Sequence, residues 1–253
     1  PTSWWPVAAG EVEESEVPLR RIQLSHRSNR GTGVETEWYL WKLLGITREP
    51  EGFSKTYLDL NFYGERGPFV EARSRYARED FFGEFLGSFA NDYGKDRIGG
   101  RSVEGPRQER GRAVWRHRQF LPDDWQLTLE ASYLSDRNFL NEWYEREFKE
   151  EKDQETLIHL KKQWGRQAVT ILGKGRVNDF QTETEAAPRI EYHLLGQPLA
   201  GDRLTYHTTS VYEYANYAPD DDLHARSSSW TNIFDSRHEL SAPVRLWHVT
   251  VVP

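Results

Sequence analysis

The residues of this chain that could do chemistry do not fall into a catalytic spacing. Four of the eight histidines lie in strand-like stretches, at His117, His159, His193 and His207. None of the four belongs to a His-Glu-x-x-His or comparable metal-binding pattern. Two acidic runs, 123–124 and 220–222, have the character of turn carboxylates, which at most bind a divalent cation weakly. Nucleophile-elbow, phosphate-loop and dinucleotide-binding signatures are absent, so we predict neither an enzyme nor a bound metal or cofactor.

Arginines and carboxylates recur instead at every second position of short stretches. Seven of them share this placement: Asp59, Glu71, Arg73, Arg75, Arg116, Arg118 and Glu130. Arginine suits a phosphate partner because its planar fork donates paired hydrogen bonds. We predict that these side chains line a hydrated lumen and meet a charged headgroup. The alternative, an ordinary solvated sheet surface, stays open for each of them.

The overall charge and the absence of cysteine exclude other chemistry. The chain of 253 residues carries a net charge of −7, and its arginines are dispersed among carboxylates. A nucleic-acid partner is excluded, because binding phosphate backbones needs clustered basic side chains. Since the chain has no Cys, it can form no disulfide and no thiolate metal site.

The alternation itself predicts β-strands, which must position the charged residues. In residues 125–133 the odd positions are apolar or aromatic and the even positions are polar, which is the period of two that a strand requires. Residues 58–62, 70–76 and 190–194 follow the same pattern, and residues 64–68 form a compact reversal with two glycines and a proline. We expect an antiparallel up-and-down meander of roughly a dozen strands of about 7 to 11 residues.

Composition is compatible with a membrane location for this all-β chain. The mean hydropathy is −0.81, but a transmembrane β-barrel alternates lipid-facing apolar residues with polar ones and so keeps a low mean. The 10 Trp, 12 Tyr and 12 Phe often stand at strand ends, where aromatic rings occupy a membrane–water interface. We predict part of a large transmembrane β-barrel, open or incomplete in this chain. A soluble, Trp-rich β-sandwich that binds carbohydrate is the rival interpretation.

Along the chain we expect an irregular leading segment at 1–17 and a partial outer-membrane barrel at 18–253. A short amphipathic helix or ordered loop interrupts the strands near 138–150, with Ser135-Asp136 as its N-cap and an apolar residue at every fourth position from Leu140. Because the chain starts at Pro1 and contains no Met, we interpret it as a mature or truncated piece of a longer protein.

Three stretches together resemble the barrel of the LptD family, also called OstA or organic-solvent-tolerance proteins. They are residues 60–67, with a strand–Arg-Gly–strand hairpin, residues 112–122, and residues 133–140, where a strand ends in Ser-Asp followed by an aromatic residue and Leu. The motif positions that carry the resemblance are Arg66, Gly67, Ser135, Asp136, Phe139 and Leu140.

The resemblance implies a protein of the bacterial outer membrane that transports and assembles lipopolysaccharide. Such a protein receives the glycolipid from a periplasmic bridge and releases it to the outer leaflet, among outer-membrane lipids, through a gate between its first and last strands. A plug lipoprotein and periplasmic bridge proteins are the implied partners. The chain departs from the family in lacking a periplasmic domain, half of the strands and a terminal aromatic, so we interpret it as the N-terminal part of the barrel. A generic outer-membrane porin is the alternative function.

Overall fold

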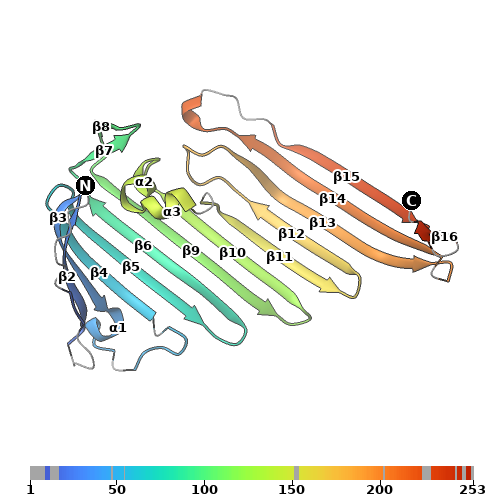
Figure 1. Ribbon diagram of the computed structural model, residues 1–253, viewed down its shortest axis with the longest axis horizontal. Coiled ribbons are helices and arrows are strands. Elements are labelled where there is room, and N and C mark those ends of the chain that lie inside the picture. The colour runs from blue at the N-terminus through green and yellow to red at the C-terminus, as the bar shows by residue number, and fades with distance from the viewer. Residues whose placement is uncertain are drawn as a thin grey trace. The chain divides into compact units, whose positions relative to one another are not determined.

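The structure, a computed structural model, confirms that the chain is all-β (Figure 1). It describes residues 9–11, 17–46, 48–53, 55–150, 154–201, 203–223, 229–242, 244–246 and 249–251. Within the segment expected to be irregular, residues 9–11 form a short strand, and residues 1–8 and 12–16 lie outside the described part of the chain. No helix among the described residues is both long and apolar enough to cross a membrane.

Most strands belong to one main sheet. They are β1 (Ala9–Glu11), β2 (Leu19–Arg27), β3 (Gly31–Tyr39), β4 (Lys55–Tyr63), β5 (Gly67–Ala77), β6 (Phe81–Asn91), β9 (Glu109–Leu121), β10 (Trp125–Leu134), β11 (Leu157–Trp164), β12 (Gln167–Lys174), β13 (Glu183–Leu199), β14 (Leu204–Ala218) and β15 (Thr231–Ser241). Two hairpins form separate two-stranded sheets, β7 (Lys95–Ile98) with β8 (Arg101–Glu104) and β16 (Val244–Leu246) with β17 (Val249–Val251). The helices are α1 (Leu40–Leu43), α2 (Phe139–Trp143), α3 (Glu145–Glu150) and the 3-10 turn η1 (Asp221–Leu223).

The main sheet follows chain order, β1-β2-β3-β4-β5-β6-β9-β10-β11-β12-β13-β14-β15. The registered neighbours pair antiparallel, as hairpin-connected strands do. The predicted up-and-down meander is therefore confirmed. Among the described residues β1 and β15 stand at opposite ends of this order, so the sheet is not closed there. The hairpin β7–β8 lies in the connection between β6 and β9.

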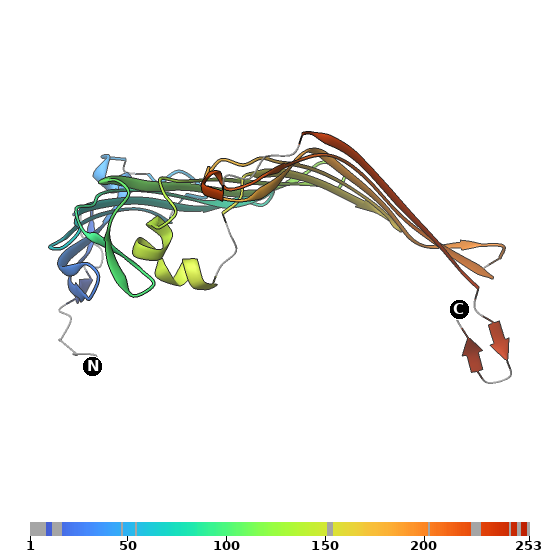
Figure 2. The same cartoon turned by 90° about the horizontal axis from the view of Figure 1, so that it is seen from above.

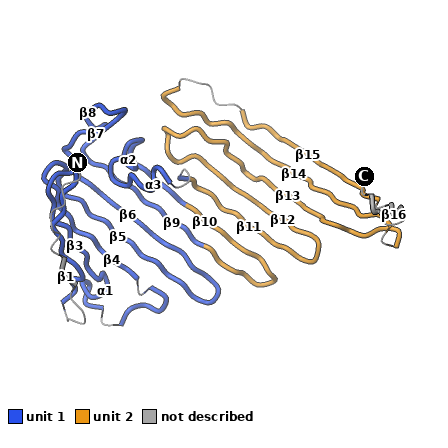
Figure 3. The backbone as a smooth tube through the Cα atoms, in the orientation of Figure 1, with its two compact units in different colours: residues 1–117, 131–154 blue, residues 118–130, 155–253 orange. Residues whose placement is uncertain are grey.

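The chain divides into two compact units (Figure 3). Unit 1 comprises residues 1–117 and 131–154, and unit 2 comprises residues 118–130 and 155–253. Unit 1 holds β1 to β8 and the helices α1, α2 and α3. The strands β11 to β17 belong to unit 2.

The sheet of unit 1 has one apolar and one polar face, because directly opposite residues on neighbouring strands project to the same side. One row across β3 to β6 consists of Thr36, Leu60, Val70 and Phe89. The adjacent row, on the other face, consists of Glu37, Asp59, Glu71 and Ser88. Leu60, Val70 and Phe89 are 40%, 38% and 51% exposed, whereas Glu37 and Glu71 are only 2% and 8% exposed. The apolar face is thus the open one, and the charged face is the covered one.

The cover on the polar face of unit 1 is the helical segment, which Figure 2 shows on one side of the strands. The α2 residues Phe139, Leu140 and Trp143 are buried, and the Trp143 ring stacks on that of Phe69 in β5 with 4.7 Å between centroids. The segment predicted as a short helix or ordered loop near 138–150 forms two short helices. Its first helix has Asn138 as N-cap, not the expected Ser135-Asp136 pair, and a break separates α2 from α3.

Unit 2 repeats the two-faced pattern over longer strands. One face carries a row of apolar residues across six strands: Leu127, Leu160, Ile171, Ile190, Tyr212 and Phe234. The adjacent row on the opposite face is mostly polar: Gln126, Lys161, Thr170, Glu191, Val211 and Asp235. Ile190, Tyr212 and Phe234 are 38%, 38% and 71% exposed. The apolar row of this unit is open as well.

Candidate functional site

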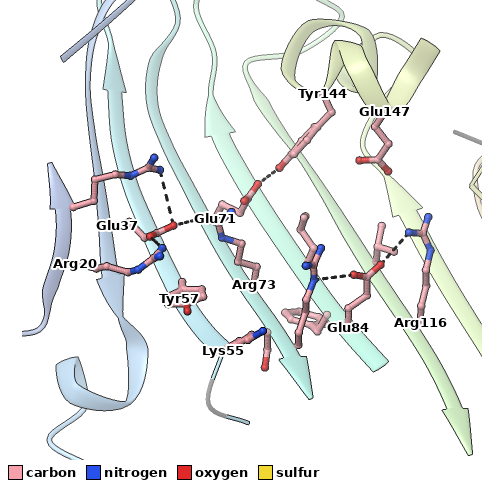
Figure 4. Close-up of a pocket in the computed structure, with 16 residues that line it drawn as sticks. Arg20, Glu37, Lys55, Tyr57, Glu71, Arg73, Glu84, Arg116, Tyr144 and Glu147 are labelled. Atoms are coloured by element: carbon pink, nitrogen blue, oxygen red, sulfur yellow. Dashed lines mark hydrogen bonds and ion pairs between the residues drawn. The ribbon is translucent and has the colours of Figure 1, made fainter. Parts of the chain in front are cut away.

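A groove of about 760 Å³ lies on the polar face of unit 1 (Figure 4). Strands β2 to β6 and β9 supply most of its walls, and Tyr144 and Glu147 from the helical segment close one side. Alternation explains part of this placement, because Glu71, Arg73 and Arg75 share one face of β5 and Val114 and Arg116 share one face of β9.

Glu37 is the central carboxylate of the groove. It accepts hydrogen bonds from Arg20 of β2 and Arg73 of β5, and Arg21 approaches it at 4.0 Å. Arg73 also pairs with Asp59 at 3.2 Å. Three strands are therefore joined by one buried acid and the arginines around it.

The groove as a whole has an excess of positive charge. Six of its lining residues are basic: Arg20, Arg21, Lys55, Arg73, Arg75 and Arg116. Four are acidic: Glu37, Glu71, Glu84 and Glu147. Glu84 is shared, since Arg75 reaches it at 3.4 Å and Arg116 at 3.1 Å. Because the Arg75 side chain is 77% exposed, it stays accessible to an anionic group entering the groove.

Tyr144 connects the helical segment to the groove. Its hydroxyl donates a hydrogen bond to the carboxylate of Glu71. Burial and the negative charge of Glu71 raise the pKa of Tyr144 well above its ordinary value, so the phenol remains a donor at physiological pH.

A second group of charges, which we call the arginine–carboxylate cluster, lies beside α2. Its members are Arg66, Arg110, Asp92, Asp96, Asp136 and Glu142. Arg110 donates to Asp96 at 2.6 and 3.1 Å, to Asp136 at 2.7 and 3.0 Å, and to Asp92 at 3.1 Å. Every donor of this guanidinium faces a carboxylate. The result is a fully buried arginine held by three acids from three different segments.

Arg66, in the β4–β5 turn, completes the cluster. It donates to Asp92 at 2.9 Å, to Asp96 at 3.1 Å and to Glu142 of α2, and also to the carbonyl oxygens of Asn29 and Lys95. The cluster therefore fastens α2 to the loops at one end of the unit 1 strands.

The four acids of the cluster outnumber its two arginines, and neutral donors satisfy the excess. The Trp143 indole donates to Asp92 at 3.1 Å, and the backbone N–H of Arg97 donates to Glu142 at 2.7 Å. Burial alone would raise the pKa of Asp96, but hydrogen bonds and charges from Arg110 and Arg66 outweigh it and hold that pKa below its ordinary value. Since Arg66 and Arg110 are 1% exposed each, the cluster is structural and the groove is the candidate binding site.

The residues that alternation singled out are divided between the two units. Glu71, Arg73, Arg75 and Arg116 line the groove, and Asp59 lies beside it, paired with Arg73. The other two, Arg118 and Glu130, belong to unit 2, where Glu130 is 8% exposed. Whether any of them faces a lumen remains a prediction.

The motif residues of the resemblance gather at the cluster. Arg66 and Asp136 are members, and the Ser135 hydroxyl donates to Asp136 at 2.8 Å. Phe139 and Leu140 are the first two residues of α2, which the cluster holds. Gly67 follows Arg66 with a φ of +93°, and a Cβ there would lie 2.4 Å from the Tyr93 ring. The stretches around 66 and 136, about 70 residues apart in the chain, therefore meet in space.

Sequence reasoning missed other members of both sites. In the groove these are Arg20, Arg21, Glu37, Lys55, Glu84, Tyr144 and Glu147, and in the cluster they are Asp92, Asp96, Arg110 and Glu142. Alternation in residues 31–39 could have found Glu37. Asp92, Asp96 and Glu142 lie outside the strands of the main sheet, where no period places them.

Comparison of the sequence with models of known protein families finds no match, and comparison with curated protein sequences finds none either.

Proposed function

We propose that this chain forms part of the wall of an outer-membrane β-barrel that moves an anionic glycolipid, lipopolysaccharide or a related molecule, to the cell surface. The observation that carries the proposal is the inverted distribution of side chains. Large apolar residues are exposed along one face of the sheet, while charged residues are paired and covered on the other. Such a sheet is suited to lipid on its apolar side and to water on its polar side.

Both units support the membrane part of the proposal. In unit 1 the exposed apolar row includes Leu60, Val70 and Phe89, and in unit 2 it includes Ile190 and Phe234. Contiguous apolar surface of this kind marks a membrane or protein interface. A soluble β-sandwich would instead bury the apolar face of each sheet against a second sheet.

The groove supports the choice of an anionic glycolipid. Its excess of Arg and Lys, which includes the exposed Arg75, matches the phosphate groups of a glycolipid headgroup. The helical segment that covers the polar face of unit 1 fits selective handling of one ligand better than the open passage of a porin. The resemblance of residues 60–67, 112–122 and 133–140 to the LptD barrel points in the same direction.

The proposal is tested in the native bacterium with the full-length protein. Fractionation is expected to recover the protein in the outer membrane, and its depletion is expected to trap lipopolysaccharide inside the outer membrane. Recovery in the soluble periplasm would overturn the membrane part. Normal surface lipopolysaccharide after depletion, with reduced uptake of small solutes, would replace the transport function by that of a porin.

Paired variants test the groove itself. Replacing Arg75 with Gln removes one basic group from the groove and should slow the appearance of lipopolysaccharide at the surface. Arg101→Gln is the matched control, because Arg101 lies on the exposed hairpin strand β8 and does not line the groove. Equal rates for the groove variant and the control would remove the groove from the transport route.

A further inference from the structure

We infer that the carboxylate of Glu147 occupies an anion-binding site on the polar face of unit 1, and that a phosphate group displaces it. The inference deepens the proposed function, on which it rests for the source of the phosphate. It adds a specific anion-binding site beside the groove, which we call the seat and which consists of the donors of Arg112 and Gln154. The Glu147 carboxylate competes with an external anion for this site.

Three N–H donors converge on the Glu147 carboxylate. Arg112 of β9 donates through both terminal nitrogens, at 2.6 and 2.8 Å, and the Gln154 amide donates at 3.1 Å. This bidentate arrangement is the geometry by which arginine binds either a carboxylate or a phosphate. The donor set is therefore one that an external anion could use.

The two residues that bind Glu147 are buried and also contact residues outside α3. The Arg112 side chain is 2% exposed and its guanidinium lies over the Tyr144 ring, 4.3 Å from the centroid. Gln154 is 2% exposed, and the buried Ser132 hydroxyl donates to its amide oxygen at 3.0 Å, which turns the amide N–H toward the seat. Contacts with Tyr144 and Ser132, both outside α3, therefore help to orient the two donors.

The occupant, in contrast, belongs to a weakly packed helix. No residue of α3 is buried, and Phe148 is 52% exposed. The ion pairs Arg146–Glu150 and Lys149–Glu145 run within the helix at its exposed surface. The hold of the seat on Glu147 is therefore a main attachment of α3 to the strands, and displacement of that carboxylate should release the helix.

The groove leads a ligand to the seat. Glu147 lines the groove together with Arg116, which lies on the same face of β9 as Arg112. A phosphate attracted by the basic lining thus meets the Glu147 carboxylate, with which it competes for the same donors. Because phosphate can bind only while Glu147 is out of the site, its apparent affinity is the intrinsic affinity multiplied by the fraction of time for which the site is empty.

The first experiment measures binding of inorganic phosphate to the purified full-length protein by calorimetry. Glu147→Gln should lower the apparent Kd for phosphate about tenfold if the carboxylate fills the seat about nine-tenths of the time. Glu145→Gln is the matched control, because it removes the same charge from the same helix at a side chain that pairs with Lys149 and does not line the groove. Its Kd should stay within about twofold of the unaltered protein. Equal affinities in the two variants would overturn the inference.

The second experiment needs no substitution in the seat, since replacing the buried Arg112 endangers folding. Hydrogen exchange of the α3 amides at 145–150 should accelerate when phosphate saturates the protein, compared with sodium chloride at equal ionic strength. A soluble short-chain phosphatidic acid serves as a second arm, and the stronger ligand identifies whether free phosphate or a lipid headgroup is the natural source. Unchanged exchange with both ligands would overturn the displacement while leaving outer-membrane location and lipopolysaccharide transport untouched.

Discussion

Placing an arginine on each face of the unit 2 sheet tests the assignment of the apolar face to lipid. Ile190 lies near the middle of the 17-residue strand β13, between Ile171 and Tyr212 of the apolar row, and is 38% exposed. Val211 of β14 lies one row away on the opposite face, directly between Glu191 and Asp235. The variants Ile190→Arg and Val211→Arg therefore make the same kind of change, from a β-branched apolar residue to arginine, on the two faces.

The two surroundings predict different magnitudes. An arginine on the lipid side of a barrel strand costs about 2–4 kcal/mol near the middle of the bilayer. At Val211 the new guanidinium would instead gain two cross-strand carboxylates, each worth roughly 0.2–1 kcal/mol. The free energy of unfolding should thus fall by about 2–4 kcal/mol for Ile190→Arg. This loss lowers the ratio of folded to unfolded protein roughly thirtyfold or more. The free energy of unfolding should change little or rise slightly for Val211→Arg.

The assay is urea unfolding of the full-length protein reconstituted in phosphatidylcholine vesicles, followed by tryptophan fluorescence. If both faces contacted water, an exposed substitution would cost within about 0.5 kcal/mol on either side. Losses of similar size in the two variants would therefore refute the assignment of the apolar face to lipid.

Three further predictions concern the arginine–carboxylate cluster and the turn beside it. Asp96→Asn should lower the free energy of unfolding by about 1.5–3 kcal/mol, because it removes the charge of a buried carboxylate that accepts hydrogen bonds from both Arg66 and Arg110; urea titration near pH 7 measures this. Because the folded-state pKa of Asp96 lies below its unfolded value, its stabilisation is present above about pH 4 and is lost as the pH falls through the folded pKa. The difference in free energy of unfolding between the unaltered protein and Asp96→Asn should therefore become smaller below that pH. A difference that does not change with pH would contradict a lowered pKa for Asp96. Gly67→Ala should cost about 1–3 kcal/mol more than Gly99→Ala, because both have positive φ but only Gly67 meets the Tyr93 ring; equal melting temperatures would show that the ring gives way.

The strands were predictable because alternation is a local property. Residues 125–133 were expected to form a strand, and β10 spans Trp125–Leu134. The same period placed Glu71 and Arg73 correctly on one face of β5 together with their neighbours on β4. The period could not assign a residue to unit 1 or unit 2, so Arg118 and Arg116 were grouped although they belong to different units.

The helical segment was predictable in position but not in form. The spacing of apolar residues from Leu140 predicts a short helix or an ordered loop. The structure has two short helices that meet at Tyr144, whose hydroxyl donates to Glu71, while Trp143 stacks on Phe69. Asp136, expected as part of an N-cap, uses its carboxylate on Arg110 and on the backbone N–H of Asn138. The pairing of Asp136 with Arg110 joins residues 26 positions apart in the chain, so no local spacing in the sequence could predict it.

Paired buried charges help to hold unit 1 together although the apolar face of its sheet is exposed. Of the five largest fully buried side chains among the described residues, four are charged: Arg66, Arg110, Glu37 and Asp96. Such residues are rarely fully buried in proteins, but in unit 1 the apolar face of the sheet is exposed and the covered face is largely charged. Each of those charges must then find a partner, because an unpaired buried charge costs several kcal/mol. Pairing of this kind fixes α2 through several segments at once. The bonds of Arg112 and Gln154 to the one carboxylate of Glu147 are a main attachment of α3, and displacement of Glu147 depends on this difference.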